Sequence, residues 1–462
     1  MKWDVDKADG VMWIASEAAK SLVKSMKDVC GIAFTKNLCY IKNHIFYWCT
    51  LEKENEKIGN FLVKKFKDDK FLKKFEKDFF NFHKKTINFL NEMDKTEFSK
   101  INDGKLFEIL KKSNDIYIHL FDWGFIAEPM DFVLPKIFEK KFKELCYNKE
   151  EISEMMVVPY ISYLSKEKQN LFKITMKNDK ELLKKHAYEY RWMISAHMGR
   201  MDIPLSYFEN RAKELDKEEL NKLKNFKSDV EKKRKELISK KPIDEEAKEL
   251  LDIIELITEV HDLRKELFLR SIYTNDTARQ EIANRYRYDK EQLACFEAKD
   301  ILKLKDGKEL DKEFADEMSK EGLIYVDTKK KIWKYLTGKK ARKFAEKEIE
   351  LGKKDIKEFK GMTASPGKAK GIVKIVYGTK ELNKVKKGDI IVSSMTKPEM
   401  APALKKIVAI VTDEGGVTCH ASIVSREMGI PCIIGTKIAT NVLRDGDLIE
   451  VDADKGIIKK IK

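Results

Sequence analysis

The stretch that decides the fold of the C-terminal region is DEGGVTCHASIVSREMGIPCIIG, residues 413–435. It follows KIVAIVTD at 406–413, an apolar and β-branched run that is typical of a buried strand. Gly429 and Pro431 are the usual residues after a helix end, and IPCIIG at 430–435 reads as a second strand. The run therefore predicts a strand, a glycine turn, a helix and another strand.

The helix start in this run carries the chemistry. Gly415 and Gly416 allow positive φ and close approach of another molecule to the backbone. Thr418 is a good N-cap for a helix that begins near Cys419, which places His420 in the first helical turn. Free N–H groups and the positive end of the helix dipole favour a phosphoryl group there. A neutral imidazole can attack phosphorus and pass the group on, so the pattern predicts that His420 carries a phosphoryl group.

The same run resembles the phosphohistidine signature of enzymes that make or use phosphoenolpyruvate (PEP). These are PEP synthase, pyruvate phosphate dikinase, enzyme I of the sugar phosphotransferase system and rifampin phosphotransferase. Flanking runs at 364–376, 396–416 and 445–461 are similar to the other strands of this domain, so the resemblance covers 361–462 without a gap. The matching residues are Gly415, Gly416, Thr418, Cys419, His420, Ala421, Ile423, Arg426, Glu427, Gly429, Ile430 and Pro431.

This resemblance implies a swivelling α/β domain over 359–462, with His420 as the catalytic residue. It also implies support of the phosphate site by Gly415, Gly416, Thr418, Cys419 and Arg426. Cys419 has two interpretations: a thiol nucleophile or metal ligand, or a small buried side chain beside the histidine. The resemblance favours the second, because family members carry Cys or Ser at this place.

The chain before this domain is mostly helical. Residues 1–50 indicate a small mixed α/β segment, with a helix over 11–28 and then a hairpin. Apolar residues then recur at spacings of three and four, so 51–358 is predicted to be a helical region with a short hairpin at 321–338. The polar run 227–250 predicts an exposed arm broken at Pro242, and helix ends are predicted at Pro129, Pro135, Pro159 and Pro204. The fold class is therefore multidomain, with a mostly helical N-terminal region followed by the swivelling α/β domain.

Two segments of the helical region are more distantly similar to the central part of rifampin-phosphotransferase-like and PEP-synthase-like proteins. Residues 181–210 contain a matching His, Tyr and Trp pattern at His186, Tyr190 and Trp192. The run that begins at 261 is similar to the helix pair that follows. The resemblance implies an acceptor site here, although His186 has a second interpretation as a helix histidine with satisfied partners. The candidate acceptor-binding residues are His186, Tyr190, Arg191, His261 and Arg264.

The phosphoryl donor is expected to bind elsewhere. Residues 1–360 lack the glycine-rich strands and the alternating α/β pattern of an ATP-grasp unit, and the chain ends too soon for a PEP-binding barrel. We therefore expect a separate ATP-grasp subunit that binds ATP and Mg²⁺, so that Mg²⁺ and ATP or PEP are bound at a partner site. No carboxylate cluster predicts a metal site in this chain. The alternative is a non-enzymatic phosphocarrier that relays phosphate only between proteins.

Composition narrows the remaining classes. The chain has 462 residues, of which 42% are hydrophobic and 37% charged, and a formal net charge of +15. No run approaches the roughly 20 apolar residues of a membrane span, and no signal peptide is evident. The positive charge is interspersed with acids and accompanies no nucleic-acid-binding motif, so nucleic acid is not an expected partner. Seven irregularly spaced cysteines suit a reducing compartment, and we expect a cytoplasmic protein.

Overall fold

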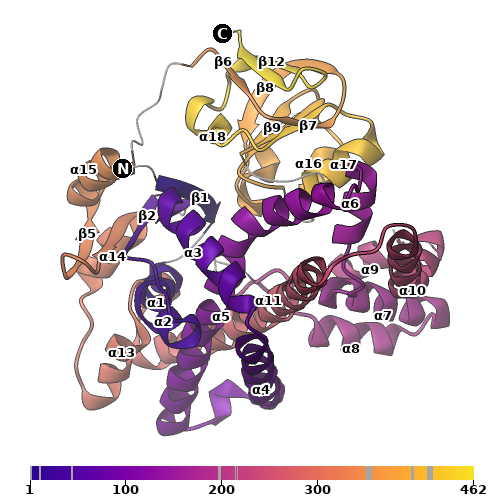
Figure 1. The fold of residues 1–462 in the computed structure, drawn as a ribbon. Helices are drawn as coiled ribbons and strands as arrows, with labels where there is room; N and C mark the ends of the chain where they lie inside the picture. The colour runs from indigo at the N-terminus through magenta and orange to yellow at the C-terminus, as the bar shows by residue number, and fades with distance from the viewer. Residues whose placement is uncertain are drawn as a thin grey trace.

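A computed structural model describes residues 3–9, 12–42, 45–195, 199–213, 215, 217–349, 356–396, 400–413 and 420–461. Figure 1 shows a large N-terminal part, mostly helical, and a C-terminal α/β domain above it. The predicted fold class is therefore confirmed. No helix in these ranges is both long and apolar enough to cross a membrane.

The N-terminal part contains five strands and fifteen α-helices among its described residues. In chain order they are β1 (Trp3–Asp9), α1 (Met12–Lys20), the π-helix η1 (Ser21–Ser25), α2 (Met26–Cys30), β2 (Lys36–Lys42), β3 (Ile45–Leu51), α3 (Glu52–Phe66), α4 (Asp69–Met93), the 3-10 helix η2 (Phe98–Lys100), α5 (Asp103–Glu144), α6 (Lys149–Met156), α7 (Tyr163–Lys177), α8 (Lys180–Glu189), α9 (Leu205–Lys213), α10 (Lys217–Lys240), α11 (Glu245–Tyr286), α12 (Lys290–Leu293), α13 (Ala298–Ile301), the 3-10 helix η3 (Leu302–Asp306), α14 (Lys312–Lys320), β4 (Glu321–Asp327), β5 (Ile332–Thr337) and α15 (Gly338–Ile349).

The two predicted hairpins are present but belong to one sheet. Its strand order is β1-β3-β2-β4-β5, and β2 pairs antiparallel with β4 along its whole length. Successive residues face opposite sides of a strand. Cys39 and Ile41 therefore pack with α1 and α14, whereas Leu38 and Tyr40 pack with α15. The sequence analysis predicted a separate small segment that ends at residue 50. In the structure, strands from both ends of the N-terminal part form one sheet.

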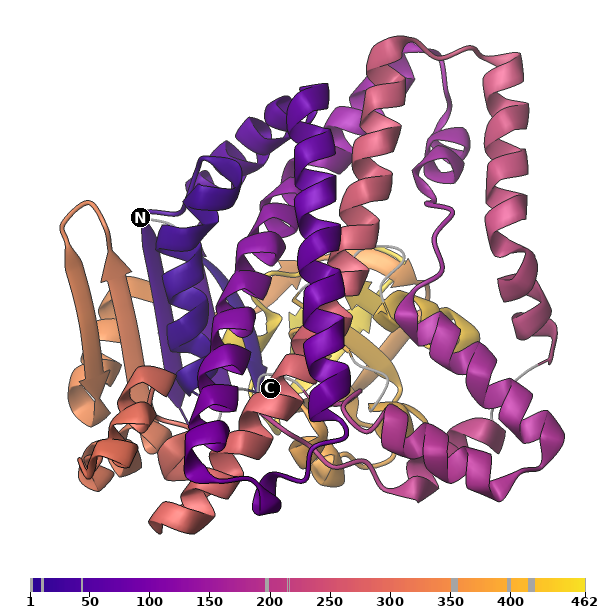
Figure 2. The ribbon, with the colours of Figure 1, turned by 90° about the horizontal axis from the view of Figure 1, so that it is seen from below.

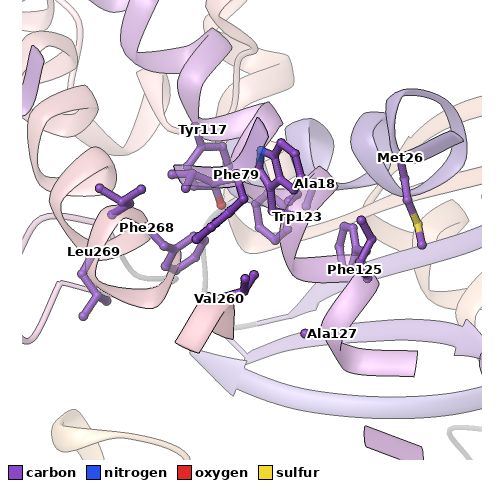
Figure 3. Close-up of a cluster of buried hydrophobic side chains, with 14 of the residues drawn as sticks. Ala18, Met26, Phe79, Tyr117, Trp123, Phe125, Ala127, Val260, Phe268 and Leu269 are labelled. Carbon is purple, nitrogen blue, oxygen red and sulfur yellow. The ribbon is translucent and has the colours of Figure 1, made fainter. Parts of the chain in front are cut away.

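Long helices form the largest core. Helices α5 and α11 pack along each other, and α3 and α4 pack against them (Figure 2). Aromatic side chains from several helices meet in this core, including Phe79, Tyr117, Trp123 and Phe268 (Figure 3).

The prediction that Pro129 and Pro135 end helices is wrong, because both lie inside α5. Proline removes one helical N–H, and tertiary packing holds the helix through it. Gly59 of α3 permits this packing: a Cβ at this position would lie only 2.2 Å from the Pro129 carbonyl oxygen.

The polar run 227–250 is helical and broken near Pro242, as predicted, but it is not a free arm. Helix α10 ends at Lys240 and α11 begins at Glu245. Arg234 is buried and donates to the Val157 carbonyl at 2.6 Å, and Lys233 pairs with Glu154 at 3.2 Å. These polar contacts, together with Leu237 and Ile238 packed against the large core, hold α10 in place.

The C-terminal domain consists of β6 (Glu358–Lys360), β7 (Met362–Ser365), β8 (Lys368–Ile375), the 3-10 helix η4 (Thr379–Lys384), β9 (Ile390–Ser393), α16 (Ala401–Leu404), β10 (Ala409–Thr412), α17 (His420–Met428), β11 (Cys432–Ile434), α18 (Ala439–Val442), β12 (Leu448–Asp452) and β13 (Ile457–Lys460). Its strands form an eight-stranded sheet in the order β6-β13-β12-β8-β9-β10-β11-β7. Helices α16 and α17 cover one face and α18 the other.

The boundaries at residues 50 and 358 remain predictions. The polar run 350–362, which contains Gly352 and Gly361 and joins two regions of different composition, predicts a linker, and the structure shortens it. Residues 350–355 are outside the described ranges. Residues 358–360 and 362–365 are strands of the C-terminal sheet, with β6 paired to β13. A linker over 350–362 is therefore too long, since its last residues belong to the domain.

Candidate functional site

Four neighbouring parallel strands define one edge of the C-terminal sheet. Strands β8, β9, β10 and β11 run in the same direction, with β10 in register between β9 and β11. All four end at the same edge, which we call the carboxyl edge. In open α/β sheets, ligands bind at this edge.

Helix α17 begins at the carboxyl edge because it connects two parallel neighbours, β10 and β11. Its first described residue is His420, which the sequence places in the first turn, and Gly429 ends it in a left-handed conformation with φ of 64°. Ile430 N–H then donates to the Ser425 carbonyl at 3.0 Å. The described part of His420 is its backbone. Gly415, Gly416, Thr418 and Cys419 lie outside the described residues.

A buried carboxylate that the sequence analysis did not single out holds the end of β10. Asp413 accepts from Thr436 Oγ1 at 2.9 Å and from both the hydroxyl and the N–H of Thr440. Its own carbonyl accepts from Lys437 N–H at 2.9 Å, and its N–H donates to the Ser393 carbonyl at 3.0 Å. These bonds tie the ends of β9, β10 and β11 together directly before the segment that leads to His420. An acid placed immediately after a buried strand was the available signal.

Arg426 is placed away from the start of α17. It lies six residues after His420, which is about 9 Å along the helix axis. The side chain is exposed, and its Nε donates to the Ser422 carbonyl at 2.8 Å. Its predicted role at the phosphate site therefore needs a reach back along the helix and stays a prediction.

His186, Tyr190 and Arg191 each have protein partners. His186 is buried, with Nε2 at 2.9 Å from Glu167 Oε1 and its ring 4.6 Å from that of Tyr190. Arg191 donates to Asp94 Oδ1 at 2.7 Å. The structure thus places His186 and Tyr190 together, whereas Arg191 belongs to a separate network. This geometry agrees with the interpretation of His186 as a helix histidine whose ring has protein partners.

His261 and Arg264 lie together on α11. His261 Nδ1 is 3.7 Å from Asp131 Oδ2, and burial together with the nearby Arg264 lowers the pKa of His261. Arg264 is buried, and its Nη2 is 3.8 Å from Glu128 Oε1. Among the described residues, Arg264 Nε has no hydrogen-bond partner, as is also true of Arg234 Nε and Arg270 Nε.

Within the described part of the chain, no three His, Cys, Asp or Glu residues are grouped so as to hold a metal ion.

Residues 385–456 match the family described as PEP-utilising enzyme, mobile domain. The matched segment lies within the C-terminal domain. This domain is similar to parts of PEP synthases: the probable PEP synthase of Archaeoglobus fulgidus is 49% identical over 152 residues, and the PEP synthase of Pyrococcus furiosus is 53% identical over 102 residues. The first match covers 33% of this chain and 19% of that protein, and the second covers 22% and 12%.

The chain therefore spans less than a fifth of the length of these relatives. The 152-residue match is longer than the mobile domain, so it includes residues that precede this domain. Among solved structures, the holo-form of Thermococcus kodakaraensis aconitase X matches with a TM-score of 0.18 and 19% identity, covering 23% of this chain and 98% of that one. A score this low says nothing about shared function.

Proposed function

We propose that this chain is the phosphoryl-carrying component of a phosphotransferase, with His420 as the residue that is phosphorylated. The observation that carries the proposal is the position of His420. It is the first residue of a helix that begins at the carboxyl edge of a parallel sheet, inside the segment that matches the mobile-domain family.

The chemistry follows from that position. The imidazole nitrogen of His420 attacks phosphorus, and the phosphorus–oxygen bond of the donor breaks. The nitrogen–phosphorus bond then breaks as an acceptor oxygen attacks. Free N–H groups of the first turn and the helix dipole favour the added negative charge. The hydrogen bonds from Thr436 and Thr440 to Asp413, which we call the Asp413 clamp, hold the end of β10 in place during these steps.

The donor is ATP, bound with Mg²⁺ on a separate ATP-grasp subunit, or PEP bound at a partner site. In support, the described strands before residue 350 form one antiparallel sheet, and helices make up most of the rest. The acceptor is a small molecule that binds the helical region, and Arg264 is a candidate residue for binding it because its Nε has no partner among the described residues. Because ATP and PEP are intracellular metabolites, the proposed location is the cytoplasm.

Labelling of the full chain tests this proposal. Incubation with ³²P-labelled PEP, or with labelled ATP, Mg²⁺ and the partner subunit, should give an acid-labile, base-stable phosphoprotein. His420→Ala should abolish the label. Equal labelling of wild type and variant would refute the role of His420. Labelling from ATP without any partner would instead refute the separate subunit. Label that passes only to proteins would make the chain a phosphocarrier.

A further inference from the structure

A buried carboxylate and a half-exposed histidine face each other on α5, far along the chain from His420. Asp122 Oδ2 lies 2.9 Å from His119 Nδ1. The Asp122 side chain is 1% exposed, whereas that of His119 is 58% exposed. The pair therefore joins a fixed, dry anion to an imidazole that solvent can reach.

The other oxygen of Asp122 is held by a π-helix. Ser21 Oγ donates to Asp122 Oδ1 at 2.5 Å, and Ser25 Oγ donates to the same oxygen. These serines are the first and last residues of η1. π-Helical turns are rare and are frequent at functional sites. Among the described residues no lysine or arginine pairs with Asp122, so hydrogen bonds from two hydroxyls and one imidazole stabilise this carboxylate.

This arrangement selects one form of the imidazole. A carboxylate only accepts, and Oδ1 already has two donors, so Nδ1 of His119 carries the proton that Oδ2 accepts. The lone pair of neutral His119 is then on Nε2, which bonds to none of the described residues. The hydrogen bond to Asp122 raises the pKa of His119, burial opposes this effect, and the charges of Asp122 and Asp115 add to it.

A second histidine–carboxylate pair has the same separation but is closed to solvent. His186 lies 2.9 Å from Glu167, the same separation, but its side chain is 3% exposed. Phe208 packs against this ring at 5.4 Å, and Arg211 takes the other oxygen of Glu167 at 2.7 Å. His186 is thus closed to any ligand, whereas His119 is open.

We infer that His119 and Asp122 form an acid–base site, in which His119 Nε2 removes a proton from a hydroxyl or a water and Asp122 orients the ring. The half-buried ring of Phe82 lies 6.4 Å from the imidazole at 75° and provides an apolar wall beside it. The site would take a small hydroxyl-bearing molecule with an apolar part. It stands or falls independently of the phosphorylation of His420.

Hydrolysis of p-nitrophenyl acetate by the full chain is a probe of such a base. A water gives its proton to Nε2 while its oxygen bonds to the acyl carbon. The bond to p-nitrophenolate breaks, and the proton then leaves Nε2 for solvent. Because Cys146 is an exposed thiol that would react with the ester, every variant carries Cys146→Ser.

His119→Ala should lower the hydrolysis rate about 10-fold, and added imidazole should restore it. His83→Ala is the matched control, since His83 is a half-buried histidine on the neighbouring α4 whose Nε2 has no partner. It should keep the full rate. Asp122→Asn should also lower the rate, because an asparagine amide can donate to Nδ1 and so favour the tautomer with the proton on Nε2.

Two results would overturn the inference. One is a His119→Ala variant with the parental rate. The other is a nitrogen-15 spectrum of labelled histidine in which the signal lost in His119→Ala is that of the tautomer protonated on Nε2. Tryptophan fluorescence matching that of the parent would show that a lost rate is not lost folding.

Discussion

The N-terminal part and the C-terminal domain, called here the two halves of the molecule although they differ in length, differ in how their strands are connected. In the C-terminal domain, β8, β9, β10 and β11 follow one another in the chain and are also neighbours in the sheet. In the N-terminal part, β2 pairs with β4, and the two strands are separated by nearly the whole helical region. The first arrangement depends on local crossovers, whereas the second depends on pairing between distant segments.

This difference suggests that the halves fold as separate units. The hydrogen bonds that the structure gives for residues 356–461 join these residues to one another. The buried clusters likewise divide between the halves, with Ile410 in a C-terminal cluster and Ile253 in the large helical one. The predictions below test this division, beginning with the one that separates the halves completely.

The largest effect is expected from a single proteolytic cut. Brief trypsin treatment should cleave first between residues 349 and 358, because this run is polar, contains Lys353 and Lys354, and joins two regions of different composition. The product should be a C-terminal fragment of about 100 residues that resists further cleavage. Mass spectrometry identifies the cut. First cleavage inside 413–435 would argue against an independent domain.

The C-terminal site was the part that sequence could predict best. A βαβ unit is local, so the strand, the turn and the helix that begins at His420 follow from consecutive residues. The Asp413 clamp was missed because Thr436 and Thr440 lie more than twenty residues away, and nothing in their spacing shows that they bond to it.

The N-terminal part was predicted by element type but not by arrangement. Helical periodicity identified the long helices, yet it could not show that α5 continues through Pro129, since Gly59 of a different helix permits that packing. The acid–base pair on α5 also escaped prediction. His119 and Asp122 are three residues apart, but the hydroxyls that fix Asp122 come from a distant π-helix.

A matched pair of core substitutions tests the division at smaller scale. Ile410→Ala in β10 and Ile253→Ala in α11 each remove a fully buried side chain and should each cost about 3 kcal/mol. All six tryptophans precede residue 350, so tryptophan fluorescence reports only the N-terminal part. Thermal unfolding followed this way should shift to lower temperature for Ile253→Ala and stay unchanged for Ile410→Ala.

Hydrogen exchange measures the effect of the same substitutions on the C-terminal domain. Ile410→Ala should speed exchange in β9, β10 and β11 while leaving α5 and α11 at their parental rates. If Ile410→Ala instead lowered the fluorescence transition as much as Ile253→Ala does, the two halves would unfold as one cooperative unit, and the comparison would fail.

The smallest expected effect is a change in how the stability of the N-terminal part depends on pH. Glu297 is buried, and burial by itself raises the pKa of its carboxyl. Donors outweigh this effect: Lys20 at 2.7 Å, Lys299 at 2.6 Å, and the hydroxyls of Ser16 and Tyr335. Together they lower the pKa of Glu297 to about 2.

A carboxyl whose pKa is lower in the folded state than in the unfolded chain stabilises the fold above the unfolded value, and this stability is lost as pH falls through the folded value. Glu297→Gln should therefore lower the free energy of unfolding at pH 7 by about 2 kcal/mol. The deficit should narrow between pH 4.5 and pH 2, where the wild-type carboxyl takes up its proton. Urea unfolding followed by tryptophan fluorescence at several pH values measures it. Glu291→Gln, at an exposed glutamate of α12, is the control and should show no deficit. If the deficit of Glu297→Gln stayed constant down to pH 2, the negative charge of Glu297 would not be what stabilises the fold.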